Sequence, residues 1–279
     1  MSRCSANDCN RWRPGLLQHV SGVTISDRWF CSRTCVEQMA HDLLLDALPQ
    51  QAGIPGLAPS RLGTLLRHYR ALTAAQLDEA LRAQDQSGLM LGAQLLALKL
   101  VDSETIVRAL AAQAGVRYLP FVDPECVRSA PGGLSRDAVR ALGLVPFSEV
   151  TDDGRIKVAC VAPLPRAALT ALHRLTSWTP EPYLVSDEDL ERLQQAYGVD
   201  ATGRVATGAG SGFVRARSVS EAAACIATAA TSARRTTMTE ASLVQYTWVR
   251  VRGAGITQDV LFAFPGAEEI ACQAAAISL

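Results

Sequence analysis

The chain has 279 residues, of which 48% are hydrophobic, and its 27 basic and 27 acidic side chains give a formal net charge of zero. This length accommodates two or three small domains, and the apolar fraction is that of a folded globular protein. The balanced charge argues against binding to nucleic acid or to an anionic membrane surface. No apolar run reaches the roughly 18 residues of a membrane span, and the first residues carry cysteine and charge rather than the apolar stretch of a secretory signal. We therefore expect a cytoplasmic protein, whose cysteines are thiols or metal ligands rather than disulfides.

Four of the eight cysteines fall in the first 35 residues, in the segments CSANDCN and WFCSRTC. Two close pairs at this separation are typical of a structural zinc site, and the predicted ligands of one Zn²⁺ are Cys4, Cys9, Cys31 and Cys35. Four thiolates leave no open position for water, so the site is predicted to be structural rather than catalytic. The knuckle between the first two cysteines is wide, which leaves His19 or His41 as alternatives to Cys4. Four unrelated thiols are the other interpretation.

The stretch GVTISDRWF alternates like one arm of a β-hairpin, and CVEQMAHDLLLDAL is predicted to form a helix near the last cysteine. Knuckle, hairpin and helix in this order are typical of a treble-clef finger. The segment FCSRTC also resembles the second ligand pair of FCS/TRASH-type zinc fingers. We therefore predict a zinc-finger-like domain over residues 1–47. Residues 48–60 contain three prolines and two glycines and are predicted to be a linker.

A 24-residue phrase then occurs twice, as RLGTLLRHYRALTAAQLDEALRAQ and as MLGAQLLALKLVDSETIVRALAAQ. Each copy predicts a short helix followed by a second helix, which in the first copy starts at a capping box of Thr73 and Gln76. The second helices place Leu77, Leu81 and Gln84 on one face, and Ile106, Leu110 and Gln113 repeat this spacing. One interpretation is a pair of packed helical hairpins with leucine cores. The glutamine at the same place in both copies has no role in such a core and favours a binding site.

Residues 116–198 are predicted to be α+β, with strands in LVPFSEV and IKVACVA around the turn DDG, a helix over RAALTALHRLT and a strand in EPYLVS. Ser186 is a predicted helix N-cap, with Asp189 three residues further on. Residues 198–212 are predicted to be a second linker. The C-terminal segment, residues 213–279, predicts a helix over SVSEAAACIATAATSARR and a hairpin from VQYTWVRVR through GAGITQ into DVLFAF, with one face of the first strand buried.

The doubled phrase and the pattern VPF…GRIKVACVAPL after it resemble the MshEN domain, the N-terminal module of type II secretion and type IV pilus assembly ATPases of the GspE/MshE group. The resemblance covers about residues 60–198. It implies tandem helical motifs over residues 61–115 and an α+β subdomain over residues 116–198. In that family the tandem motif binds cyclic di-GMP. The resemblance therefore implies a ligand site formed by Arg61, Leu62, Gly63, Leu66, Leu77, Leu81, Gln84, Leu91, Gly92, Leu95, Ile106, Leu110 and Gln113.

This chain departs from the family pattern at four motif positions. The family has glycine between the two helices, where this sequence has Arg70 and Lys99. We expect a positive φ at that position, which strains a residue with a side chain. The other two departures are Arg67 at a usually apolar position and Met90 in place of the opening arginine.

No G-x-x-x-x-G-K-[ST] phosphate-binding loop occurs in the sequence, and no Ser-His-Asp or Cys-His set has local support. We therefore expect a non-enzymatic protein of the α+β class, with the zinc finger before the MshEN unit and a C-terminal helix and hairpin after it. The predicted function is a regulatory, MshEN-type cyclic di-GMP receptor without the ATPase motor. The alternative is a structural adaptor of a secretion or pilus assembly system that has lost ligand binding. The sequence does not name a protein partner; a secretion or pilus component is the candidate that the resemblance offers.

Overall fold

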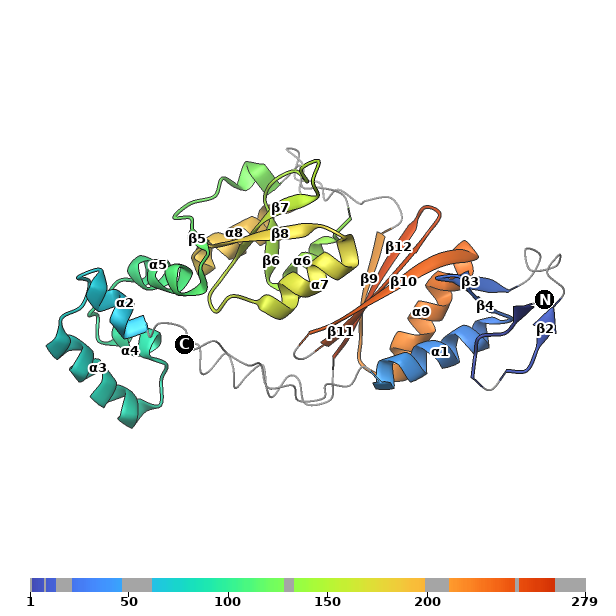
Figure 1. Cartoon of the computed structure of the whole chain (residues 1–279), viewed down its shortest axis with the longest axis horizontal. Helices are drawn as coiled ribbons and strands as arrows, with labels where there is room; N and C mark the ends of the chain where they lie inside the picture. The colour runs from blue at the N-terminus through green and yellow to red at the C-terminus, as the bar shows by residue number, and fades with distance from the viewer. Residues whose placement is uncertain are drawn as a thin grey trace.

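The computed structural model of the chain describes residues 2–7, 9–13, 22–46, 62–127, 133–198, 211–243 and 246–263. Arg61, His19 and the linker predicted over residues 48–60 lie outside these ranges, as does most of the second predicted linker. Three bodies follow one another along the molecule (Figure 1): tandem helices, a small α+β unit, and a larger sheet with two helices. The mixed α+β class that we expected is confirmed.

The tandem helices form the first body. They are α2 (Leu62–His68), α3 (Ala74–Ser87), α4 (Leu91–Ala97) and α5 (Ser103–Ala114). The predicted capping box is confirmed, because the Thr73 side chain accepts from the backbone N–H of Gln76 and the Gln76 side chain accepts from that of Thr73. Asp102 has the equivalent role in the second copy, where it accepts from the N–H of Thr105 at 2.7 Å. Each copy therefore forms the predicted pair of helices.

The α+β unit follows. Its elements are β5 (Arg117–Tyr118), a 3₁₀ turn η2 (Pro124–Val127), α6 (Arg136–Leu142), β6 (Leu144–Pro146), β7 (Arg155–Cys160), α7 (Arg166–Thr176), β8 (Thr179–Leu184) and α8 (Asp187–Ala196). The sheet order is β5-β8-β7-β6, with β7 and β8 parallel across the crossover helix α7. The predicted N-cap is confirmed, since Ser186 accepts from the N–H of Asp189 at 3.1 Å.

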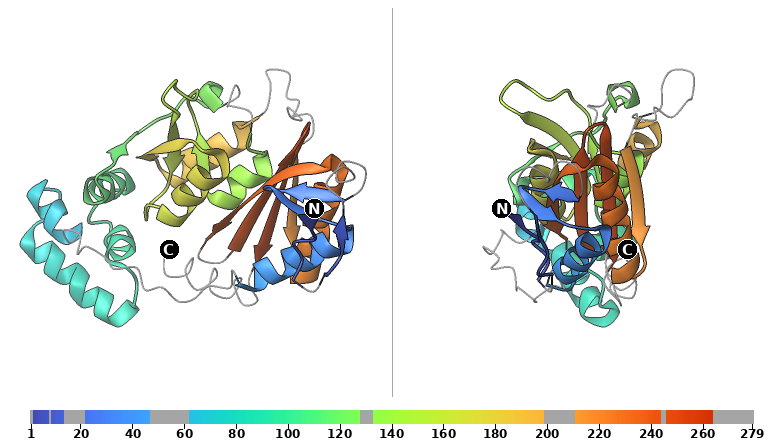
Figure 2. Two further views of the ribbon diagram at one scale, coloured as in Figure 1. Left: turned by 45° about the vertical axis from the view of Figure 1, so that its right-hand side comes forward. Right: turned by 90° about the vertical axis from the view of Figure 1, so that its right-hand side faces the viewer.

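The third body combines the two ends of the described chain. It contains β1 (Ser2–Arg3), β2 (Trp12–Arg13), β3 (Val23–Ile25), β4 (Arg28–Phe30), α1 (Arg33–Asp46), β9 (Ser211–Ala216), α9 (Val219–Ala233), β10 (Arg235–Ser242), β11 (Tyr246–Gly253) and β12 (Ile256–Ala263). Its larger sheet has the order β4-β3-β10-β11-β12-β9. The sequence suggests separate N- and C-terminal units, but β3 pairs with β10, and α1 packs along α9 (Figures 1 and 2). Both ends therefore share one hydrophobic core.

Three local predictions for this body need correction. The stretch GVTISDRWF forms both arms of a hairpin, β3 and β4, because Ser26 and Asp27 take the positive φ values that a tight two-residue turn requires. Strand β10 is absent from the predicted elements. Residues 211 and 212, assigned to a linker, begin β9.

The burial predicted for one face of β11 is confirmed at Trp248 but is incomplete, because the opposite face is buried as well. Val249 and Val251 face the core with α1 and α9, whereas Trp248 belongs to the core of the α+β unit. The strand is central in its sheet and has a packed layer on each side, so its residues need not alternate between apolar and polar.

The α+β unit is joined to the large sheet through the end of α7. Arg250 and Arg252 of β11 both donate to the backbone carbonyl of Leu175, in the last turn of that helix. Such carbonyls lack helical partners and carry the negative end of the helix dipole, so they favour cations. Arg250 is itself 1% exposed and forms a two-pronged ion pair with buried Asp259 at 2.7 and 2.8 Å. Trp248 donates to the same carboxylate at 3.0 Å, which completes a buried polar junction.

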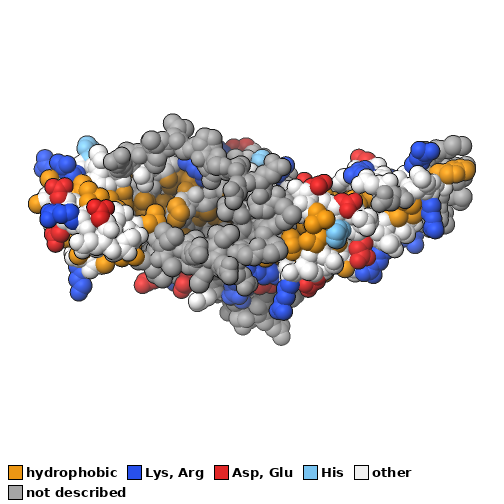
Figure 3. All heavy atoms as spheres, turned by 90° about the horizontal axis from the view of Figure 1, so that it is seen from below, with side chains coloured by type: hydrophobic (Ala, Val, Ile, Leu, Met, Phe, Trp, Pro, Cys, Tyr) orange, Lys and Arg blue, Asp and Glu red, His pale blue; other side chains and the backbone are white. Residues whose placement is uncertain are grey.

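The surface seen in Figure 3 carries basic and acidic side chains interspersed at both ends, in keeping with the zero net charge. Within the described ranges, no helix combines the length and the apolar character that a bilayer crossing requires.

Candidate functional site

The four N-terminal cysteines are positioned by two backbone turns. Cys4 follows β1 and Cys9 precedes β2, in a turn closed by a bond from the Cys9 N–H to the Ala6 carbonyl at 3.2 Å. Cys31 follows β4, and Cys35 lies in the first turn of α1. The antiparallel pairing of β1 with β2 and of β3 with β4 brings both turns to the N-terminal end of α1.

The four sulfur atoms lie within 4.8 Å of one another. The sulfur of Cys31 is 3.6 Å from that of Cys9 and 3.5 Å from that of Cys35. Four thiolates around a zinc ion at about 2.3 Å would be about 3.8 Å apart, so the spacing fits tetrahedral coordination. The backbone N–H of Cys31 lies 3.4 Å from the sulfur of Cys4, a contact of the kind that orients a thiolate ligand. The cluster can therefore hold a metal ion, and it includes Cys4 despite the wide knuckle.

The environment perturbs the pKa values of these thiols in opposite directions. A hydrogen bond with the backbone of Arg11 lowers the pKa of Cys9 to about 7. Burial raises the pKa of Cys31 to about 12, and burial also raises that of Cys35. Metal ligation requires thiolates, so a metal must displace protons from the half-buried thiols of Cys31 and Cys35. Its affinity is therefore expected to fall as the pH falls.

The tandem motif forms two structurally equivalent turns between its helices. In the first copy the Arg70 N–H bonds to the Arg67 carbonyl at 3.0 Å and the Ala71 N–H to the Leu66 carbonyl at 2.9 Å. In the second copy, Lys99 and Leu100 make the corresponding bonds to Leu96 and Leu95 at 2.9 and 3.0 Å. This is the Schellman pattern of helix termination, which requires a left-handed residue. The expected positive φ is present, at 58° for Arg70 and 54° for Lys99.

The two Leu-Gly pairs face each other across a pseudo-two-fold axis. A Cβ atom on Gly63 would lie 2.7 Å from Leu77 of its own copy and 3.5 Å from Leu91 of the other. A Cβ on Gly92 would lie 3.6 Å from both Ile106 of its own copy and Leu62 of the other. Correspondingly, α2 packs mainly on α5, and α4 on α3. The glycines therefore allow the two copies to interlock closely.

The predicted ligand-binding residues differ in accessibility. The most deeply buried are Leu66, Leu95, Ile106 and Gly63. Half-buried positions are Leu62, Leu77, Gln84, Leu91, Gly92, Leu110 and Gln113, and Leu81 is 41% exposed. The structure thus brings the motif residues together, but the side chains of Leu66, Leu95 and Ile106 belong to the core of the helices. Arg61 lies outside the described residues.

The two half-sites are not identical. Leu110 packs against both the helical core and the core of the α+β unit, whereas its equivalent Leu81 is exposed. Sequence reasoning also missed Gln94, which is 6% exposed and accepts a bond from the Ser87 hydroxyl at 2.6 Å. That bond ties the end of α3 to α4. The only sequence signal for it is an amide within an otherwise apolar helix.

Comparisons with known proteins bear on the middle of the chain. The model of the MshEN domain matches residues 118–204. The chain is similar to the solved structure of MshE with cdg, at 24% identity and a TM-score of 0.41, over 50% of this chain and 99% of that one. Two crystal forms of the N-terminal domain of XpsE are similar at 24% identity, with TM-scores of 0.35 and 0.30, over 49% and 54% of this chain and 93% and 99% of theirs. The comparison with curated proteins found no match. The family-model match therefore covers the α+β part of the chain and ends before β9.

Proposed function

We propose that the chain is a non-catalytic regulatory protein whose tandem motif binds cyclic di-GMP. The MshEN match covers the α+β part, and the tandem motif that resembles the family's ligand site directly precedes it. The chemistry of the motif suits a nucleotide, because each copy offers an amide, a close backbone approach and apolar contact.

The observation that carries this proposal is the pseudo-two-fold arrangement of the two copies. A Cβ atom on Gly63 would contact Leu91 and one on Gly92 would contact Leu62, so each Leu-Gly segment lies beside that of the other copy. Cyclic di-GMP is itself a pseudo-two-fold ring with two guanines and two phosphates. One molecule of ligand therefore matches two half-sites related by such an axis.

The groups available for recognition are polar and cationic. Gln84 and Gln113 are half-buried at equivalent places, the end of each second helix. Arg67, Arg70 and Lys99 are exposed and supply positive charge that phosphates attract. By resemblance, Arg61 adds a further cation to one half-site.

The alternative function is a protein adaptor with the same fold and no nucleotide ligand. The burial of Leu66, Leu95 and Ile106 favours it, because these side chains already have partners within the helices. The strained Arg70 and Lys99 favour it too, since they stand where the family has glycine.

We also propose that the four-cysteine cluster holds a structural Zn²⁺. All four tetrahedral positions would be filled by Cys4, Cys9, Cys31 and Cys35, so no position remains for a catalytic water. The ion would fix the two turns on α1, and through β3 it would support the large sheet.

Calorimetric titration of the full chain with cyclic di-GMP tests the receptor proposal. Gln84→Ala and Gln113→Ala should each weaken binding about three- to tenfold, as expected for loss of a hydrogen bond worth roughly 0.5–1.5 kcal/mol. Gln86→Ala, an exposed glutamine on the same helix α3, is the matched control and should bind as the wild type does. Absence of both heat and a thermal shift in the wild-type protein would refute the receptor and leave the adaptor function.

A further inference from the structure

Strand β10 is paired on one side along only a small part of its length. It has eight residues, but β3 pairs only with Arg235 and Thr236. The Ser26 N–H donates to the Thr236 carbonyl at 2.9 Å, and the Ser26 hydroxyl then accepts from the Met238 N–H at 3.1 Å. Here the chain turns away from β10 into β4, so pairing on this side stops at Met238.

The remaining backbone groups on that side face outward. Successive residues of a strand direct their N–H and C=O groups to opposite sides. Leu243 exchanges both bonds with Tyr246, at 2.7 and 3.4 Å, so odd-numbered residues of β10 face β11. Glu240 and Ser242 therefore direct their backbone groups away from β11, and within the described ranges no strand pairs with them there. A short open sheet edge results.

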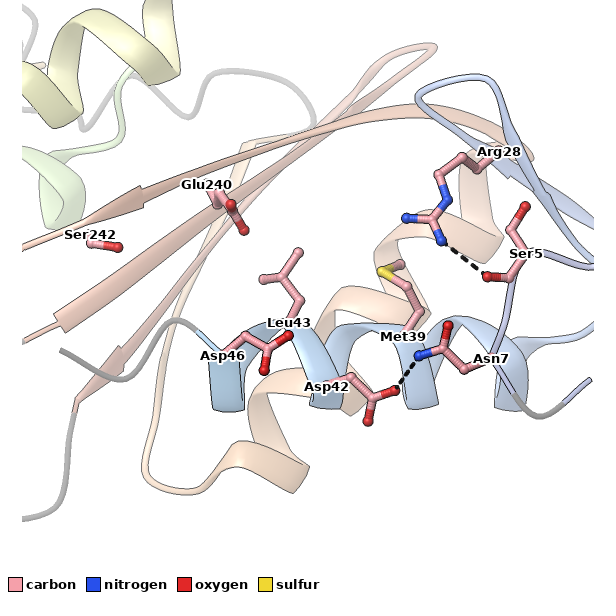
Figure 4. A pocket seen from close by; sticks show the side chains of 9 residues that line it. All are labelled: Ser5, Asn7, Arg28, Met39, Asp42, Leu43, Asp46, Glu240 and Ser242. Atoms are coloured by element: carbon pink, nitrogen blue, oxygen red, sulfur yellow. Dashed lines mark hydrogen bonds between the residues drawn. The ribbon is translucent and has the colours of Figure 1, made fainter. Parts of the chain in front are cut away.

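A groove runs beside this open edge (Figure 4). Two adjoining cavities of about 550 and 220 Å³ share the lining residues Arg28, Met39, Leu43 and Glu240. Strand β10 forms one wall and α1 the other, and the Arg28 side chain closes one end by donating to the Ser5 carbonyl at 3.0 Å. Half-buried Met39 and Leu43 give the groove an apolar side.

The rim of the groove is acidic. Three carboxylates line it, those of Asp42, Asp46 and Glu240, against the single guanidinium of Arg28. Asp42 accepts from the amides of Gln38 and Asn7 at 2.9 and 3.4 Å. Glu240 and Asp46 are exposed, and neither forms an ion pair with any other described residue.

We propose that this groove binds an extended peptide with basic side chains, which adds as a strand to β10. Its backbone would pair with Glu240 and Ser242, as peptides do when they extend a sheet at its edge. Its lysines or arginines would lay their aliphatic stems on Met39 and Leu43 and place their charges at the carboxylates. The open length of β10 suits a peptide of about four or five residues, at a rise of about 3.3 Å each.

Charge selects this occupant over a second copy of the chain. Antiparallel pairing of two β10 edges about Glu240 would place like charges directly opposite each other, which is destabilising. A basic strand avoids this repulsion and neutralises the carboxylates that face the groove.

Fluorescence anisotropy of the full chain with a labelled ten-residue peptide that alternates lysine with threonine tests the proposal. Two other peptides serve as comparisons: one with glutamate in place of lysine, and one N-methylated at alternate residues on the pairing side. We expect binding by the lysine peptide to weaken with salt, and at least tenfold weaker binding by each comparison peptide. Equal binding by the N-methylated or the glutamate peptide, or no binding by the lysine peptide, would overturn the proposal.

Two variants separate the backbone from the charge. Glu240→Pro removes an N–H that faces away from β11, a position where edge strands tolerate proline, and should abolish peptide binding with the fold retained. Glu240→Gln keeps the N–H and should weaken binding a few-fold with a smaller salt dependence. Glu188→Gln, at an exposed position of α8, should leave binding unchanged. If light scattering shows a dimer that only Glu240→Pro dissociates, the edge belongs to a second copy and the peptide proposal fails. The N-methylated peptide decides the matter should Glu240→Pro not fold.

Discussion

Glycine in place of Arg70 or Lys99 should stabilise the tandem helices, although either change removes a charged side chain. Both residues stand at the left-handed position of a helix-terminating turn, with φ values of 58° and 54°. Each donates its N–H to a backbone carbonyl, which glycine preserves. The side chains are exposed, so their loss leaves no cavity.

The expected gain follows from two opposing terms. A left-handed conformation costs a residue with a side chain roughly 1–2 kcal/mol. Glycine also stabilises the unfolded chain by roughly 0.4–1 kcal/mol, because it gives that chain more conformational freedom, and this offsets part of the gain. Each substitution should therefore stabilise by about 0.5–1 kcal/mol, and the double variant by about 1–2 kcal/mol, because the two turns are separate. For a protein of this size, the double variant should raise the Tm by roughly 2–8 °C.

Urea unfolding and thermal melts followed by circular dichroism measure this effect. Arg67→Gly is the matched control, since it removes the same charge from the helical part of α2 and should destabilise by about 0.5–1 kcal/mol. A lower Tm in both Arg70→Gly and Arg67→Gly would refute the reasoning. Titration of Arg70→Gly with cyclic di-GMP gives a second test, through the direction in which the affinity changes. Tighter binding shows that Arg70 disturbs the turn, and weaker binding with less salt sensitivity shows that it contacts a phosphate.

Three further predictions concern other parts of the chain. Metal analysis should find about one zinc per chain, which is released on acidification as the thiols of Cys31 and Cys35 regain protons and is lost in Cys31→Ser. Full zinc content in that variant would exclude the cluster. Arg250→Met should destabilise by roughly 3–5 kcal/mol in urea unfolding by leaving Asp259 buried and unpaired, and adding Asp259→Leu should recover most of the loss. Arg61→Ala should weaken cyclic di-GMP binding about ten- to hundredfold, the equivalent of roughly 1.5–3 kcal/mol; unchanged affinity would remove Arg61 from the site.

The amino-acid sequence by itself determines the features that depend on near neighbours in the chain. Helix α7 spans the predicted residues 166–176, and the N-caps at Thr73 and Ser186 form as predicted. The left-handed turns at Arg70 and Lys99 are expected from the resemblance, because the family has glycine at that position. A cap or a helix-terminating turn is made by side chains and backbone within a few residues of each other, so a short segment contains all the groups that form it.

The binding surfaces depend on more than local pattern. The leucine spacing marks one face of each helix, but only packing shows that Leu66, Leu95 and Ile106 are buried while Leu81 is exposed. A periodic apolar face fits a core and a ligand site equally well. Burial depends on which helix lies opposite, and here that helix comes from the other copy of the motif.

Strand β10 is the clearest feature that tertiary structure alone decided. Its sequence, RTTMTEAS, lacks a regular apolar pattern and does not predict a strand. It becomes one because β11 pairs with all of its residues from Thr236 to Ser242, and β3, from the other end of the described chain, pairs with its first two residues. A strand is stabilised by hydrogen bonds to neighbours that its own sequence does not specify. The open edge beside Glu240 exists for the same reason, because where pairing stops depends on where a distant hairpin turns away.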